Sequence, residues 1–79
     1  MSDRPSPQIA LGEAVRYIRE REGLTQEEVA FEAGVHPTFV SRVERGLQDL
    51  RWSSLHRVAA GLGVPVHEVV SLAEHTELD

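Results

Sequence analysis

Residues 25–46 read TQEEVAFEAGVHPTFVSRVERG, and this stretch decides the fold. It begins with a capping box, in which the hydroxyl of Thr25 accepts from the amide of Glu28 while the Glu28 carboxylate reaches back. Gly34 supplies a left-handed turn after a first short helix. Pro37 suits the first position of a second helix, because its missing amide costs nothing there. The stretch therefore predicts two short helices joined by a tight turn.

Apolar residues recur at helical spacing on both sides of this pair. We expect further helices over residues 9–22, 52–62 and 64–74, with Gly23 and Gly63 as stops. The residues expected to face the core are Leu11, Ala14, Val15, Ile18, Val29, Ala30, Ala33, Val40, Val43, Trp52, Leu55, Val58, Ala59 and Leu62, and Phe31 is expected in the core or at its rim. With no strand pattern and no repeat, the sequence predicts an all-α fold of five helices around one core.

The composition limits the function classes. The chain has 79 residues and no cysteine, so we expect one domain with neither a disulfide framework nor a thiolate metal site. The histidines show no metal-ligand spacing, and no nucleophile–base pair stands out, so we expect no metal, no cofactor and no enzyme. The start MSDRPSPQIA has no apolar run, which argues against a secretory leader, and no stretch approaches the roughly 20 apolar residues of a membrane span. We expect a disordered arm over residues 1–8 and a domain over residues 9–76.

The net charge of -5 is unevenly distributed. Residues 16–57 hold as many arginines as acidic residues, so the surplus acid lies towards the ends of the chain. Every basic side chain is an arginine, which reflects either codon usage or a preference for the planar guanidinium that binds guanine and phosphate through two hydrogen bonds. The acidity weakens long-range attraction to nucleic acid, and a DNA-binding chain of this kind would depend on a dimer and a specific site.

The chain resembles the Xre/Cro-like repressors in two segments: their helix-turn-helix in LTQEEVAFEAGVHPTFVSRVERG, and their fourth and fifth helices in SSLHRVAAGLGVPVHEVV. The small controller proteins of restriction–modification systems are similar in size and layout. The resemblance spans about residues 11–72. It implies a compact five-helix Cro/lambda-repressor-like domain and a cytoplasmic, bacterial or phage-encoded transcription regulator that binds a palindromic operator in double-stranded DNA as a homodimer.

The second helix of the pair, residues 36–46, is the expected recognition helix in the major groove. Such a helix needs small or forked polar groups at its N-terminal end and along one face, where they reach base edges. We expect base contacts from His36, Pro37, Thr38, Ser41 and Arg42. The family often has a long polar residue at the position of Pro37, which offers only an apolar contact, for instance to a thymine methyl group. We therefore expect DNA shape to contribute to recognition.

The expected phosphate-contacting residues are Thr25, Gln26, Phe39 and Arg45. The family pattern implies that Gln26 binds a phosphate at the start of its helix, where the dipole favours an anion, and that Arg45 lies near the DNA backbone. Phe39 can pack against a sugar but cannot donate a hydrogen bond. Structural alternatives stay open: a solvated Arg42, a helix-start role for Thr38, a close-approach role for Ser41, a cap for His36, and an Arg45 that complements the helix dipole.

Two further expectations concern assembly. In similar repressors the positions of Arg19 and Glu44 form a shielded ion pair that ties two helices together. The last helix carries more apolar surface than one small core is expected to cover. We therefore expect a dimer interface made by Leu47, Leu50, Val66, Val69 and Val70.

An alternative function is a protein-interaction module with weak DNA binding, such as an antitoxin or an adaptor with an unidentified protein partner. The absence of a long tail beyond Glu74 argues against an antitoxin, while the net acidity argues mildly for an interaction role.

Overall fold

The computed structural model describes residues 6–78, with the backbone alone over residues 76–78. It contains the helices α1 (Pro7–Arg21), α2 (Gln26–Ala33), α3 (Pro37–Glu44), α4 (Trp52–Leu62) and α5 (Val66–Leu78), and no strand within the described range. The predicted all-α, five-helix fold is confirmed. Gly23 and Gly63 follow the ends of α1 and α4 with left-handed backbones, as predicted.

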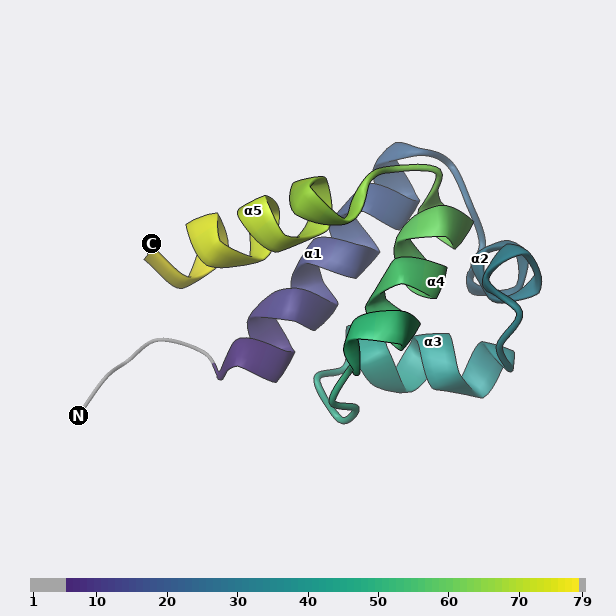
Figure 1. The fold of residues 1–79 in the computed structure, drawn as a ribbon, viewed down its shortest axis with the longest axis horizontal. Helices are drawn as coiled ribbons and strands as arrows, with labels where there is room; N and C mark the ends of the chain where they lie inside the picture. The colour runs from purple at the N-terminus through teal and green to yellow at the C-terminus, as the bar shows by residue number, and fades with distance from the viewer. Residues whose placement is uncertain (1–5, 79) are drawn as a thin grey trace.

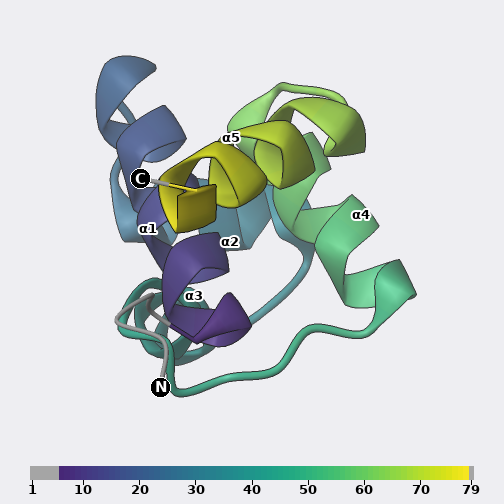
Figure 2. The ribbon, with the colours of Figure 1, turned by 90° about the vertical axis from the view of Figure 1, so that its left-hand side faces the viewer.

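Helix α1 lies between α5 and α3, and α2 packs against α3 and α4. One side of α1 lies against α5 and another against α3, while α4 lies against α2. Figure 1 shows α5 running beside α1 at one end of the molecule and α2 at the other end, with α3 along the lower edge. Figure 2, seen from the side, shows α5 crossing over α1 and the long loop that leads from α3 to α4. The helix-turn-helix pair, α2 and α3, therefore lies away from the last turns of α5.

One apolar core joins all five helices. Its largest fully buried side chains are Ile18, Leu62, Val15, Val29, Val40, Val43, Val58 and Val69. The prediction that Val69 contributes to a dimer interface is wrong, because α5 packs along α1 and turns Val69 and Ala73 into the core of a single chain. Val66 and Val70 are half-buried and pack against the same core.

Two aromatic side chains expected in the core or at its rim lie on the surface. Phe31 is 82% exposed, because its position on α2 points away from the buried face formed by Val29, Ala30 and Ala33. Trp52 is 69% exposed, because it is the first residue of α4 and lies beyond the end of the core, where its ring packs edge-on against His56.

The ends of the domain also differ from the prediction. The hydroxyl of Ser6 accepts a hydrogen bond from the amide of Ile9 at 3.2 Å, and Pro7 follows as the first helical residue. The expected arm over residues 1–8 is therefore wrong at residues 7 and 8, which belong to α1, and residues 1–5 lie outside the described range. At the other end, α5 continues to Leu78 instead of ending near residue 74.

Candidate nucleic-acid interface

The start of α2 has the predicted capping box. The amide of Glu28 donates to the Thr25 hydroxyl at 3.0 Å, and the amide of Thr25 donates to the Glu28 carboxylate at 2.8 Å. This reciprocal cap fixes where the helix begins and leaves Gln26 as its first residue. The positive end of the α2 dipole lies there, where it favours an anion such as a phosphate.

The turn between α2 and α3 is built as its sequence predicts. Gly34 has φ of 72°, a backbone conformation that favours glycine, and the amide of Val35 donates to the carbonyl of Ala30 at 3.0 Å. Val35 is half-buried against the core. His36 caps α3, because its Nδ1 accepts from the amide of Thr38 at 3.0 Å, so the cap expected as an alternative role for His36 is confirmed.

Helix α3 has a core face and an outer face. Val40 and Val43 are buried, while Thr38, Arg42 and Arg45 are exposed and Ser41 is half-buried. At 100° per residue, Thr38, Arg42 and Arg45 project from the side of α3 opposite the two valines. The structure therefore brings these three polar side chains onto one outer face.

The half-buried residues of α3 lie at the border of this face. Phe39 packs against the core cluster, so only part of its ring is available for the expected contact with a sugar. Pro37 is half-buried at the first position of the helix. These two residues contribute shape to the surface but no hydrogen-bond donor.

The two arginines of the outer face form hydrogen bonds with nearby residues of the same chain. Arg42 donates through Nη2 to the carbonyl of Leu47 at 3.2 Å and through Nε to the Gln48 side chain at 3.5 Å. Arg45 donates through Nε to the carbonyl of Ser41 at 3.4 Å. These contacts are exposed and near the upper limit for hydrogen bonds, so either guanidinium can exchange them for a stronger acceptor at little cost.

A shielded polar cluster lies behind the start of α2. Arg19 and Glu44 form the predicted ion pair, with Nε–Oε2 at 2.6 Å, Nη2–Oε1 at 3.0 Å and side chains only 14% and 4% exposed. The hydrogen bond to Glu44 raises the pKa of Arg19 above its ordinary value. Arg19 also donates to the carbonyl of Leu24 at 2.8 Å, and Gln26 donates through Nε2 to Glu44 Oε1 at 2.9 Å. The sequence alone does not predict the contact of Gln26 with Glu44, because the pair is 18 residues apart.

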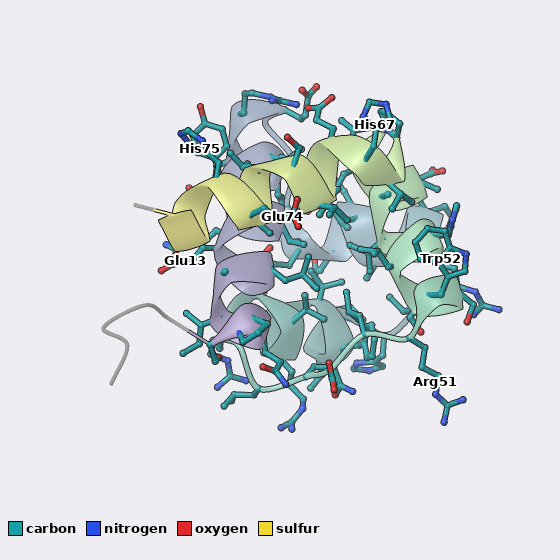
Figure 3. The ribbon with its side chains drawn as sticks, turned by 60° about the vertical axis from the view of Figure 1, so that its left-hand side comes forward. Glu13, Arg51, Trp52, His67, Glu74 and His75 are labelled. Atoms are coloured by element: carbon teal, nitrogen blue, oxygen red, sulfur yellow. The ribbon has the colours of Figure 1, made fainter. Side chains whose placement is uncertain are left out.

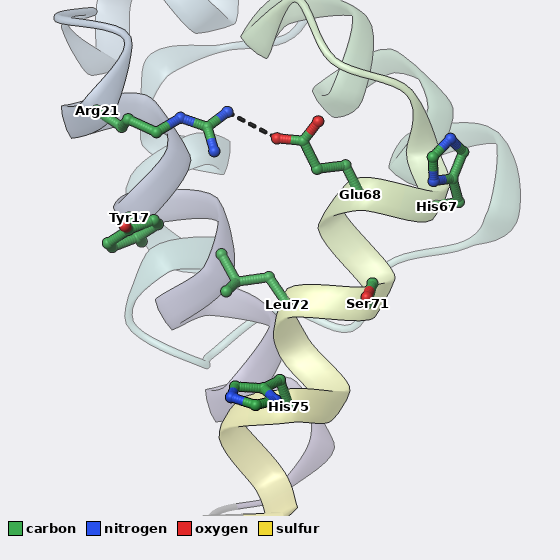
Figure 4. A pocket seen from close by; sticks show the side chains of 7 residues that line it. All are labelled: Tyr17, Arg21, His67, Glu68, Ser71, Leu72 and His75. Atoms are coloured by element: carbon green, nitrogen blue, oxygen red, sulfur yellow. Dashed lines mark hydrogen bonds and ion pairs between the residues drawn. The ribbon is translucent and has the colours of Figure 1, made fainter.

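The surface between α1 and α5 carries a second, exposed ion pair. A hollow of about 540 Å³ lies between α1 and α5, and Figure 4 shows Arg21 reaching across it to Glu68, with Tyr17 and Leu72 below. The Arg21 Nη2–Glu68 Oε2 distance is 2.7 Å. In Figure 3, Glu74 and His75 lie on α5 away from α3, whereas Arg51 projects outward at the start of α4. Acidic residues of α5 thus lie at a distance from the outer face of α3.

The remaining predicted residues are spread over two segments. Leu47 is 54% exposed and Leu50 is half-buried in the loop before α4, while Val66 and Val70 lie on α5. Within residues 6–75, no group of three or more histidine, aspartate or glutamate side chains is arranged to hold a metal ion. Among the helices over the described range, none is both long and apolar enough to cross a membrane.

Comparison with known proteins places these features in context. The sequence model of the family described as "Helix-turn-helix domain" matches residues 10–72. Control protein C.BamHI from Bacillus amyloliquefaciens is 33% identical over 57 residues, which cover 71% of this chain and 70% of that protein. The crystal structure of the clp gene regulator ClgR from C. glutamicum matches with a TM-score of 0.89 and 31% identity, covering 98% of this chain and 99% of that one. The restriction-modification controller protein C.AhdI from Aeromonas hydrophila matches with a TM-score of 0.78 and 28% identity, covering 82% of this chain and 98% of that one.

Proposed function

The chain belongs to the helix-turn-helix domain family, and we propose that it is a sequence-specific transcription regulator that binds a palindromic operator in double-stranded DNA as a homodimer. The observation that carries this proposal is the outer face of α3, where Thr38, Arg42 and Arg45 project away from the core. The similarity to ClgR and C.BamHI, described as a gene regulator and a control protein, supports the same function. We propose accordingly that it works in the cytoplasm and catalyses no reaction.

We assign a base contact to Arg42 and a phosphate contact to Arg45. Arg42 lies one helical turn after Thr38, on the side that enters the major groove, where a guanidinium binds the two acceptors of guanine. Arg45 is the cap residue at the end of α3, where the chain turns away from the bases, so its partner is a phosphate. Thr38 and Ser41 complete the base-contacting set with His36 and Pro37 at the helix start. Thr25 and Gln26 bind phosphate at the start of α2, and Phe39 packs against a sugar.

The test compares Arg42→Ala and Arg45→Ala on DNA selected from random sequences by the wild-type protein. Arg42→Ala should relax the preference at one base pair per half-site, where the contact is worth roughly 1–3 kcal/mol against the wrong base. Arg45→Ala should weaken binding to all sequences alike and lower the salt slope by about one for each phosphate that the arginine no longer neutralises. The measurement is affinity for the operator and its single-base variants at several salt concentrations.

A matched control is Arg16→Ala, which removes the same charge from an exposed arginine paired with Glu20 on α1. Its base preferences should equal those of the wild type. If Arg42→Ala also keeps the wild-type base preferences, the assignment of a base contact to Arg42 is wrong. Thr38, Ser41 and DNA shape must then determine the sequence specificity.

Dimerisation follows from the same proposal, because a twofold dimer presents two recognition helices to half-sites about 34 Å apart. We assign its interface to Leu47 and Leu50 of the loop before α4 and to Val66 and Val70 of α5. Sedimentation at tens of micromolar protein should show a dimer, and Leu47→Asp should shift it towards the monomer. A wild-type monomer in solution that also binds DNA as a monomer would contradict the dimer.

The second candidate function is a protein-interaction module, which the exposed Phe31 favours. Phe31 lies with Glu27 and Glu32 at a hollow of about 480 Å³ that is also lined by Gly61 of α4, and it is 82% exposed. A protein partner with basic and apolar side chains would complement this ring and the two carboxylates beside it. Selection from random DNA separates the two functions, since an interaction module with weak DNA binding would enrich no common sequence.

A further inference from the structure

Glu44 occupies an unusual place for a carboxylate. It is the last residue of α3, yet its side chain is only 4% exposed. Its two oxygens accept three hydrogen bonds, two from Arg19 on α1 and one from Gln26 on α2. One carboxylate therefore links the end of the recognition helix to the first residue of the helix before it.

We propose that Glu44 is a positioning residue for DNA binding, which orients the side-chain amide of Gln26 so that its second N–H is presented to a DNA phosphate. This inference rests on the proposed function and on Gln26 as a phosphate ligand. It assigns to Glu44 a role beyond holding α1 and α3 together.

The hydrogen bond with Glu44 determines which end of the Gln26 side-chain amide faces the carboxylate. A carboxylate only accepts hydrogen bonds, so it selects the NH₂ end of the Gln26 amide rather than its carbonyl end. The bond from Gln26 Nε2 to Glu44 Oε1, at 2.9 Å, uses one of the two N–H groups. The other N–H remains available, and Gln26 is half-buried, so part of the side chain still faces solvent. A freely rotating amide would present its carbonyl oxygen to the phosphate part of the time, and ordering it on binding would cost affinity.

Arg19 makes this arrangement compatible with DNA. An unpaired carboxylate near the start of α2 would repel a phosphate, but the guanidinium of Arg19 neutralises Glu44 through two hydrogen bonds. Arg19 is itself held by the carbonyl of Leu24, just before the capping box of α2. The carboxylate therefore cannot turn away from Gln26 without breaking its bonds to Arg19.

The test is a double-mutant cycle with Gln26→Ala, Glu44→Gln and the variant that carries both changes. Glu44→Gln keeps the size of the side chain but replaces one accepting oxygen by a donating NH₂ group, so it cannot accept all three of the hydrogen bonds that Glu44 accepts from Arg19 and Gln26. The measurement is affinity for the selected duplex, corrected for the folded fraction determined by circular dichroism. Each single variant should weaken binding roughly tenfold per half-site, as expected for a hydrogen bond to a charged group. The double variant should bind no more weakly than either single variant, because both changes remove the same contact.

The matched control is Val69→Ala, which destabilises the core under α5 without touching Glu44 or Gln26. Its folded fraction should bind the duplex as the wild type does. A second readout is the NMR signal of the Gln26 side-chain amide in the free protein. The chemical-shift difference between the two amide protons should be larger in the wild type than in Glu44→Gln. A purely structural role of Glu44 towards Arg19 would not cause this change.

Two results would overturn the inference. One is wild-type affinity of folded Glu44→Gln together with weakened binding by Gln26→Ala. The other is a double variant whose loss is the sum of the two single losses in free energy. Failure of the proposed function is recognised separately, because the wild-type protein would then select no duplex at all.

Discussion

The two sides of α1 are joined to their neighbours in different ways. Towards α3 the backbones approach closely: a Cβ added at Gly12 would lie 2.2 Å from the carbonyl oxygen of Val43 and 2.9 Å from that of Glu44. The shielded Arg19–Glu44 pair lies at the same contact between the two helices, the α1–α3 seam. The contact between α1 and α5 is the α1–α5 seam. Towards α5 the contact is more extensive, and it borders the hollow of about 540 Å³, across which Arg21 and Glu68 form an exposed pair.

The two ion pairs have similar N–O distances, but their side chains differ in exposure. Their shortest N–O distances are 2.6 Å for Arg19–Glu44 and 2.7 Å for Arg21–Glu68, and each raises the pKa of its arginine chiefly through the hydrogen bond to its glutamate. The side chains of the second pair, however, are 41% and 38% exposed, so water competes for them. Removing a partner of the first pair leaves a shielded charge without its counter-ion.

This difference matches the roles proposed for the two regions. The α1–α3 seam fixes the recognition helix and the start of α2 relative to each other, and DNA binding needs that geometry. The α1–α5 seam buries Val69 and Ala73, while its Arg21–Glu68 pair lies exposed at the hollow. We expect substitutions in the first seam to cost stability and DNA affinity together, and substitutions of the exposed Arg21–Glu68 pair in the second to cost little of either.

Glu44→Ala should have the largest effect. It leaves the guanidinium of Arg19 shielded and without its carboxylate, which typically costs about 3–5 kcal/mol of the free energy of unfolding. Urea denaturation followed by circular dichroism measures this loss. A free energy of unfolding equal to that of the wild type would mean that water solvates the pair despite its burial, and the contrast between the seams would fail.

Gly12→Ala should have the next largest effect. Alanine favours a helix interior over glycine by about 0.5–1 kcal/mol, so the substitution would stabilise α1 if the site were open. Here the new methyl group meets the backbone of α3, and such overpacking typically costs about 1–3 kcal/mol.

Glu13→Ala is the control for Gly12→Ala, because it changes the neighbouring exposed residue of the same helix. Its stability, measured by the same urea denaturation, should stay close to that of the wild type. A Gly12→Ala protein more stable than the wild type would show that α1 and α3 can separate without loss.

Local chemistry explains what the sequence predicts well. The capping box at Thr25 and Glu28, the turn at Gly34 and the cap at His36 each depend on residues a few positions apart, and all three have the predicted geometry. The helical spacing of apolar residues likewise identifies most of the core. The family resemblance added the Arg19–Glu44 pair, which local chemistry alone does not indicate.

What the sequence predicts wrongly depends on how helices are placed in space. Phe31, Trp52 and Val69 are all apolar, and only the packing of α2, α4 and α5 decides which of them is covered. The need for glycine at position 12 appears only when α3 lies against α1. The bond between Gln26 and Glu44 likewise joins positions far apart in the chain, and each residue has several plausible partners until the fold is known. The roles of the outer face of α3 towards DNA stay predictions.

Glu68→Gln should have the smallest effect. The substitution keeps the size of the side chain and an acceptor for Arg21, which also holds a bond of its own to the carboxylate of Glu22 at 3.1 Å. Because the pair is exposed, water and salt already screen its attraction, and Arg21 keeps a partner after the change. Melting curves of the wild type and of Glu68→Gln should therefore coincide within error at high salt and differ only slightly at low salt. A loss comparable with that of Glu44→Ala, unchanged by salt, would mean that the hollow shields Arg21 and Glu68 as effectively as α3 shields Arg19. Exposure of the side chains would then not determine how much each ion pair contributes to the free energy of unfolding.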